Sequence, residues 1–297
     1  MNLKHKIIID TDIGDDVDDA FAIALALKSP SLDLVGITTV FKNSNMRSKI
    51  VKAEIEAFGK KGIDVVSGLD KPLVVPPSTF SYETIGDDGK PIITAYDESY
   101  VSGADAFDAP NYLLKKAKEF PREITLIAIG PLTNLAKAID IDPEGFKLFK
   151  EIIMMGGSNQ GVKEWNYICD PQAAEIVLNS GVPIRIIPIE CTILCEVKEN
   201  HYKKLLNPIN KEQSFLLDMY QRWRKNQTRP CQMHDCLAVQ ELIQSYCNLK
   251  NVNISVSLSE NEIGRTIIRD DGELNAKIAV SVRCNEFMNH LFEVLYS

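Results

Sequence analysis

Six aspartates lie within ten residues near the start of the chain, in the segment DTDIGDDVDD (residues 10–19). Apolar residues flank this segment on both sides, in the runs III (7–9) and AFAIALAL (20–27). Carboxylates this close together repel one another, and placing charge beside a core costs further free energy. A hard cation offsets both costs, because Ca²⁺ takes about six to eight oxygen ligands and Mg²⁺ takes fewer carboxylates with more water. The segment therefore predicts a cation site.

A helix N-terminus explains only part of this cluster. Aspartate is favoured at N-caps and in first turns, where the helix dipole is positive. This accounts for Asp18 and Asp19, which open a helical pattern. It does not account for Asp10 and Asp12, which end a strand-like run. An EF-hand is excluded because its fifth loop position needs an oxygen ligand, and counting from Asp10 that position is Gly14.

Short β-branched runs alternate with helical patterns along the chain. Strands are expected at 6–10, 32–40, 64–68, 123–130, 151–157, 183–190, 254–259, 265–271 and 277–282. Helices are expected at 18–29, 46–62, 109–120, 131–140, 170–181, 211–226, 234–247 and 285–295. Near-continuous apolar strands between helices predict an α/β fold: a mostly parallel, doubly wound, Rossmann-like sheet with helices on both faces and a small C-terminal β-hairpin. No linker divides the chain, so residues 1–297 are expected to form one domain.

Ligands of such sheets bind outside the carboxyl ends of the strands, and the polar clusters of this chain follow strands. The long stretch 69–103, rich in Pro, Gly, Ser and Asp, is expected to be a loop. Long loops in compact domains are often lids or disordered, and both alternatives stay open for residues 80–103. The net charge of −8 and the absence of a basic run argue against nucleic acid and membrane surfaces as partners. No apolar stretch approaches the roughly 18 residues of a membrane span, so we expect a cytoplasmic protein.

Eight motifs resemble, in order, those of the inosine-uridine preferring nucleoside hydrolase family. They are DTDIGDDVDDA (10–20), GITTVFKN (36–43), VSGLDKPL (66–73), IGPLTNLA (129–136), MGG (155–157), EWNYICDPQAA (164–174), HDCLAV (234–239) and GRTIIRD (264–270). Each motif alone is weak, but their order over nearly the whole chain is specific. The resemblance implies Ca²⁺-dependent hydrolysis of the N-glycosidic bond of ribonucleosides, giving ribose and a free purine or pyrimidine base. It also implies a role in nucleoside salvage and a homodimer or homotetramer.

The resemblance further implies a role for each matching residue. Asp12 matches an aspartate that binds Ca²⁺ and acts as general base on a calcium-bound water, and His234 matches a general acid in part of the family. The implied Ca²⁺ ligands are Asp12, Asp19, Asp235 and the main-chain carbonyl of Ile129; the implied substrate-binding residues are Asp18, Asn43, Met155, Glu164 and Asn166; and Asp10 is implied as a supporting group.

The aspartate loop is longer than the commoner form of the family motif. Asp15 and Asp16 are therefore rivals of Asp18 and Asp19 for the metal and ribose roles. Asp18 and Asp19 are favoured, because Ala20 and the helix follow them directly.

The part of the chain that would contact the base departs further from the family. Residues 80–103 contain no histidine, although many members carry a His-Gly segment before the IGPLTNLA strand. Base preference therefore does not transfer. Trp165 is expected in the core, and Tyr220 and Trp223 are expected either in the core or stacked on a base.

Two other functions are compatible with parts of the sequence. A Mg²⁺-dependent phosphatase of the haloacid dehalogenase type also begins with a strand that ends in Asp-x-Asp, here Asp10 and Asp12. That type usually has Thr or Val where this chain has Gly14. A non-catalytic nucleoside- or ribose-binding protein would keep the calcium site and lack base activation, as the missing His-Gly segment allows.

Overall fold

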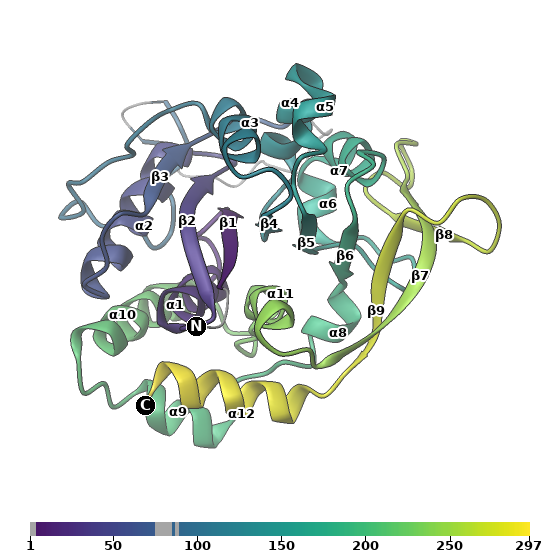
Figure 1. The fold of residues 1–297 in the computed structure, drawn as a ribbon. Helices are drawn as coiled ribbons and strands as arrows, with labels where there is room; N and C mark the ends of the chain where they lie inside the picture. The colour runs from purple at the N-terminus through teal and green to yellow at the C-terminus, as the bar shows by residue number, and fades with distance from the viewer. Residues whose placement is uncertain (1–3, 75–84, 87–88) are drawn as a thin grey trace.

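One nine-stranded sheet runs through the part of the chain described by the computed structural model, residues 4–74, 85–86 and 89–297 (Figure 1). Its strand order is β3-β2-β1-β4-β5-β6-β9-β7-β8. The strands are β1 His5–Thr11, β2 Leu32–Thr39, β3 Asp64–Ser67, β4 Ile124–Ala128, β5 Glu151–Met155, β6 Ile184–Ile187, β7 Cys247–Val256, β8 Thr266–Arg269 and β9 Ala276–Val282. Pairing is parallel from β3 to β9, and β7 runs antiparallel to both β9 and β8. The predicted mostly parallel sheet with a C-terminal hairpin is confirmed.

Helices cover both faces of this sheet (Figure 1). They are α1 Asp18–Lys28, α2 Ser44–Ala57, α3 Ala109–Glu119, α4 Thr133–Ile141, α5 Pro143–Phe146, α6 Trp165–Cys169, α7 Pro171–Leu178, α8 Ile189–Thr192, α9 Glu199–Leu205, α10 Lys211–Asn226, α11 His234–Ile243 and α12 Cys284–Leu295. One layer contains α1, α2, α10, α11 and α12, and the opposite layer contains α3, α4 and α7. Within the described ranges, every helix is too short or too polar to cross a lipid bilayer.

The central strand β1 shows how the sequence builds these two layers. Ile7 and Ile9 pack into the core beneath α1 and α11, whereas Ile8 packs into the core beneath α3 and α4. Successive side chains of a strand point to opposite faces, so a strand with helices on both sides must be apolar throughout. The apolar run ends at Asp10, near the carboxyl end of β1.

Several boundaries differ from those predicted. The helix expected at 46–62 begins at Ser44, because the Asn43 side chain caps it by accepting a hydrogen bond of 3.1 Å from the Met46 N–H. Strand β7 begins at Cys247, earlier than expected, because its polar first half pairs with β9. The short helices α5, α6, α8 and α9 were not expected, since a helix of one or two turns has little periodicity to detect.

The stretch after β3 packs in part against the aspartate loop. Within the stretch 80–103, for which a lid was one of the open alternatives, residues 80–84 and 87–88 lie outside the described residues. Further along, the Ala95 N–H donates a hydrogen bond of 2.8 Å to the Gly14 carbonyl. A Cβ on Gly14 would lie 2.5 Å from Ile93, and the positive φ of Gly14, 114°, also favours glycine there. The segment around Ile93 is therefore docked on the aspartate loop.

Candidate active site

A cavity of about 480 Å³ lies at the carboxyl ends of β1, β4 and β5. The residues on its walls are Asp12, Asp15, Asp16, Asp18, Asp19, Ile129, Met155, Lys163, Glu164, Trp165, Asn166, Ile189, Gln227, Arg229, His234 and Asp235. Most of the residues singled out from the sequence are therefore brought together, although Asp18 and Asp235 are 217 residues apart in the chain. Asn43 and Asp10 are the two that do not line the cavity walls formed by the described residues.

Three buried aspartates form a compact group on one wall. One carboxylate oxygen from each of Asp18, Asp19 and Asp235 lies within 4.8 Å of the other two. Asp18 and Asp19 begin α1, and Asp235 lies in the first turn of α11. Both helix N-termini therefore direct their positive dipole ends at the group. An all-oxygen donor set of this kind suits a hard cation, and the group could hold one.

The electrostatics of this wall also fit a cation. Burial raises the pKa of Asp12 to about 6, against the opposing effect of Arg47 and with a contribution from Asp15. Burial, with a contribution from Asp16, raises the pKa of Asp18 to about 8. Burial raises the pKa of Asp19 and of Asp235 well above the usual range, and the other carboxylates of the group add to this. So much buried negative charge is unfavourable without a counter-charge. A cation held among these oxygens would supply that counter-charge.

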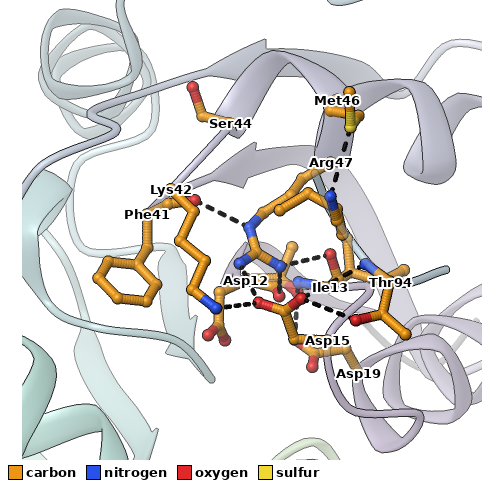
Figure 2. A network of polar contacts seen from close by, with 12 residues as sticks. Asp12, Ile13, Asp15, Asp19, Phe41, Lys42, Ser44, Met46, Arg47 and Thr94 are labelled. Carbon is orange, nitrogen blue, oxygen red and sulfur yellow. Dashed lines mark hydrogen bonds and ion pairs between the residues drawn. The ribbon is translucent and has the colours of Figure 1, made fainter. Parts of the chain in front are cut away.

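Asp12 reaches the cavity because β4 continues into a glycine. A Cβ on Gly130 would lie 2.9 Å from the main-chain nitrogen of Asp12 and 2.9 Å from its Oδ1, so a larger residue would displace it. On the other side, the Arg47 guanidinium donates to the main-chain carbonyl of Asp12 (Figure 2). The main chain at Asp12 is therefore held between β4 and α2.

Asp10 lies behind the cavity and is fully buried. Its Oδ1 accepts hydrogen bonds from the Thr38 hydroxyl and, at 2.8 Å, from the Asn134 side-chain amide. Burial raises the pKa of Asp10 to about 7, although these two donors lower it. Asp10 thus joins β1 to β2 and α4.

Glu164 and Asn166 line another part of the cavity wall. Glu164 accepts hydrogen bonds from the Gly157 N–H at 3.0 Å and the Asn166 N–H at 2.9 Å, which caps α6. Burial raises the pKa of Glu164 to about 7, although these main-chain donors lower it. The Asn166 amide donates to the carbonyls of Ile129 at 3.2 Å and Met155 at 3.1 Å. This wall therefore ties the ends of β4 and β5 together.

His234 opens α11 at the outer side of the cavity. Its Nδ1 lies 2.8 Å from the Thr192 hydroxyl, which in turn donates to the Ile189 carbonyl at 3.3 Å. Burial lowers the pKa of His234 to about 4, against the opposing effect of Asp16. Thr192 was missed by sequence reasoning, because it lies on a short helix outside any motif.

The rival aspartates of the longer loop are paired with basic side chains. Oδ2 of Asp15 lies 2.9 Å from Lys42 Nζ and 2.8 Å from Arg47 Nη2. Asp16 forms an ion pair with Arg229. Neither belongs to the compact group of aspartates found in the described part of the chain. Both extra acids are therefore neutralised by the protein itself.

The expectation that Trp165 belongs to the core is wrong. Trp165 is 50% exposed and lines the cavity, because it follows the Glu164 cap as the first residue of α6. Tyr220 and Trp223 are buried core residues of α10. Lys163, Gln227 and Arg229 also line the cavity but lie in loops, where the sequence carries no periodic signal.

Known proteins resemble this chain over most of its length. Residues 7–289 match the family model of the inosine-uridine preferring nucleoside hydrolases. A probable uridine nucleosidase of Arabidopsis thaliana is 33% identical over 240 residues, covering 73% of this chain and 70% of the relative. A non-specific ribonucleoside hydrolase of Salmonella typhi is 30% identical over 311 aligned positions, covering 99% and 98%.

Solved structures agree with these relatives. A plant nucleoside hydrolase superposes with a TM-score of 0.80 at 28% identity, covering 99% of both chains. An inosine-guanosine nucleoside hydrolase superposes with a TM-score of 0.81 at 26% identity, covering 98% of this chain and 99% of the other. The TM-scores show that the sheet and its helices are arranged as in these hydrolases. The chain belongs to the inosine-uridine preferring nucleoside hydrolase family.

Proposed function

We propose that this hydrolase is Ca²⁺-dependent and cleaves ribonucleosides with water into ribose and a free purine or pyrimidine base. Membership of the family supports hydrolysis of the N-glycosyl bond. The observation that carries the metal dependence is the group of Asp18, Asp19 and Asp235, three buried carboxylates within 4.8 Å of one another on the wall of a cavity of suitable size.

The cation would be held by Asp12, Asp19, Asp235 and the main-chain carbonyl of Ile129. That carbonyl already accepts a hydrogen bond from Asn166, but a carbonyl oxygen has two lone pairs and keeps one for the cation. Several carboxylates with a carbonyl suit Ca²⁺ better than Mg²⁺, which keeps more of its water. When bound, Ca²⁺ supplies positive charge that orients the water and the ribose hydroxyls and lowers the pKa of the water.

Asp12 is the proposed general base. Asp12 would accept a proton from the attacking water while the water oxygen bonds to C1′ of the ribose. The electron pair of the C1′–N bond would leave with the nucleobase. The carboxylates around the cavity stabilise the positive charge that develops on the sugar in the transition state. Attack on the face opposite the base inverts the configuration at C1′. A general base of this kind contributes about 10²–10⁴-fold to the rate.

The remaining predicted residues would hold the substrate. Asp18, Glu164 and Asn166 face the cavity from two walls and would hydrogen-bond the ribose hydroxyls. Met155 would pack against the sugar. Asn43 caps α2 and does not line the cavity in the described residues, so its contact with the ribose stays a prediction from the resemblance. His234 would donate a proton to the leaving base. A homodimer or homotetramer and a cytoplasmic role in salvage stay predictions.

Ribose release is the experiment that tests this function. The protein is incubated with a panel of purine and pyrimidine ribonucleosides, with Ca²⁺ or with a chelator, and ribose and free base are quantified. We expect release from at least one nucleoside with Ca²⁺ and loss of release with the chelator. Absence of release from every nucleoside contradicts the proposal; tight binding without turnover would indicate a binding protein, and Asp10-dependent release of phosphate from an aryl phosphate would indicate a phosphatase.

A further inference from the structure

Arg47 is a fully buried cation beside the candidate active site, and its guanidinium is hydrogen-bonded on three sides (Figure 2). Nη1 donates to the main-chain carbonyls of Asp12 and, at 2.7 Å, of Ile13. Nη2 donates to Oδ2 of Asp15 at 2.8 Å. All three acceptors belong to the aspartate loop, so one side chain of α2 determines the course of that loop.

The same guanidinium is itself fixed by the turn after β2. Its Nε donates to the Phe41 carbonyl at 2.9 Å. Phe41 and Lys42 have φ angles of 74° and 62°, in the left-handed region that non-glycine residues rarely adopt. Their N–H groups donate to the carbonyls of Leu69 and Asp70, each at 2.7 Å. Such strained turns persist where surrounding contacts over-determine them, and they are typical of functional sites.

Asp15 makes the buried charge of Arg47 tolerable and extends the network. Burial opposes ionisation of Asp15, but Arg47 and Lys42 outweigh this effect and lower its pKa to about 2. Oδ1 of Asp15 also accepts a hydrogen bond from the Thr94 hydroxyl at 3.4 Å. Asp15 is the carboxylate that the guanidinium bonds directly, while Asp12 and Asp19 attract it from farther away. Removing the directly bonded partner of a buried charge is costly. Replacing either Arg47 or Asp15 therefore leaves the other without its direct ionic partner in this contact.

We propose that Arg47 and Asp15 are positioning residues, which fix the main chain at Asp12 and so aim the Asp12 carboxylate at the attacking water. This inference rests on the proposed function. It gives the extra length of the aspartate loop a purpose, since Asp15 lies in that extra length. Neither residue is assigned a contact with substrate. Their effect on the reaction passes through Asp12.

The test compares Arg47→Lys and Asp15→Asn with the wild-type protein, using the ribonucleoside that the wild type hydrolyses fastest, at saturating Ca²⁺. Lysine keeps the charge but lacks the planar fork that bonds two carbonyls and a carboxylate together. Because a misplaced catalytic group costs up to about 10²-fold, we expect kcat to fall about 10- to 100-fold in each variant. KM should change less than about threefold, because the contacts of Glu164 and Asn166 are untouched.

The double variant sharpens this comparison. If Arg47 and Asp15 act as one pair, adding Asp15→Asn to Arg47→Lys should lower kcat by much less than Asp15→Asn lowers kcat of the wild-type protein. Independent, multiplicative losses would contradict a shared role.

Arg185→Lys is the matched control. Arg185 forms a two-bond ion pair with Glu151, at 2.9 Å and 3.0 Å, at the amino ends of β5 and β6, away from the cavity. Its replacement should lower the Tm to a similar extent without lowering kcat. A loss of kcat in this control that matches the loss in Arg47→Lys would assign the effect to general destabilisation and overturn the proposal.

Amide hydrogen exchange supplies a readout that does not depend on activity. Exchange at residues 12–17 should be faster in Arg47→Lys and in Asp15→Asn, and unchanged in Arg185→Lys. If the wild type is active and each variant keeps a kcat within about twofold of the wild-type value, the positioning role of the pair is overturned whatever the exchange rates, and the proposed function stands. A wild type that releases no ribose overturns the proposed function, and the positioning role with it.

Discussion

The main-chain N–H of Asp235 donates a hydrogen bond of 3.1 Å to Oδ2 of Asp18, across 217 residues of chain. This bond joins the first turn of α11 to the first turn of α1, two helices that pack side by side in the same core. It brings two positive helix ends to one point, and both stabilise negative charge there. The candidate cation site thus depends on the contact between α1 and α11, which are far apart in the chain.

Calcium should stabilise the folded protein. Binding to the native state alone adds about 2.7 kcal/mol when Ca²⁺ is at 100 times its Kd, so the Tm should rise by roughly 5–10 °C. Thermal unfolding with Ca²⁺ and with a chelator measures this shift. Asp235→Asn should lose most of it, whereas Asp142→Asn, at the N-cap of α5, should keep it. An equal Tm in both conditions would contradict a calcium site.

Asp12→Asn should nearly abolish turnover while the protein stays folded. Asparagine has the same shape but cannot accept the proton of the attacking water, so kcat should fall about 10²–10⁴-fold. Steady-state kinetics measures kcat, and a thermal unfolding curve shows whether the variant is folded. Asp16→Asn is the control, because Asp16 lines the same cavity but pairs with Arg229. Equal losses in the two variants would show that the general charge of the cavity, rather than a base, is what matters.

His234→Gln should affect substrates according to their leaving groups. If His234 donates a proton to the departing base, its loss should lower kcat for ordinary nucleosides by about 10²-fold. An aryl riboside that releases nitrophenolate needs no such proton, so its hydrolysis should change less than about threefold. Parallel assays of the two substrates give the ratio. A similar loss on both would indicate that His234 only supports the wall of the cavity through Thr192.

Glu54 should make stability depend on pH. This side chain of α2 is fully buried, and in the described part of the chain neither carboxylate oxygen has a hydrogen-bond partner. Burial raises the pKa of Glu54 well above 4.5, and Asp19 adds to this. The folded state therefore keeps a proton that the unfolded state releases. As the pH rises above about 4.5, this group lowers the free energy of unfolding by up to about 1.4 kcal/mol per pH unit until its folded pKa is reached.

Glu54→Gln removes that titration, so the variant should gain stability relative to the wild type as the pH rises from 4.5 to 7. Urea unfolding at several pH values measures the difference in the free energy of unfolding between Glu54→Gln and the wild type. The contributions of the other buried acids cancel in this difference, because both proteins contain them. Glu56→Gln, exposed on the same helix, should show no such trend. A difference between Glu54→Gln and wild type that is independent of pH would contradict a buried, protonated Glu54.

The strands and long helices were predictable because their signals are local. The helix predicted at 211–226 is α10, Lys211–Asn226, and the apolar run before Asp10 is the central strand. Boundaries were predicted less well where a partner decides them, as in the polar first half of β7. That segment becomes a strand because β9 lies beside it, and no periodicity in its own residues shows this.

The residues of the candidate site were predictable where acidic residues follow strands. They were not predictable where the role of a residue depends on its burial in the folded protein. An arginine such as Arg47 on a helix normally faces solvent, and nothing within α2 distinguishes it from an exposed one. Its burial depends on Asp15, thirty-two residues earlier. Trp165 was misplaced for the converse reason, because an aromatic residue between two polar side chains can belong to the core or to the wall of a cavity.

The division of the aspartate group between α1 and α11 has a consequence for protein synthesis. A ribosome makes Asp18 and Asp19 first and Asp235 only after β1 to β6 have been completed. A nascent chain that already has most of its parallel sheet therefore still lacks one of the three aspartates and the helix N-terminus on which that aspartate lies. The candidate cation site is therefore incomplete until Asp235 and the first turn of α11 have been made.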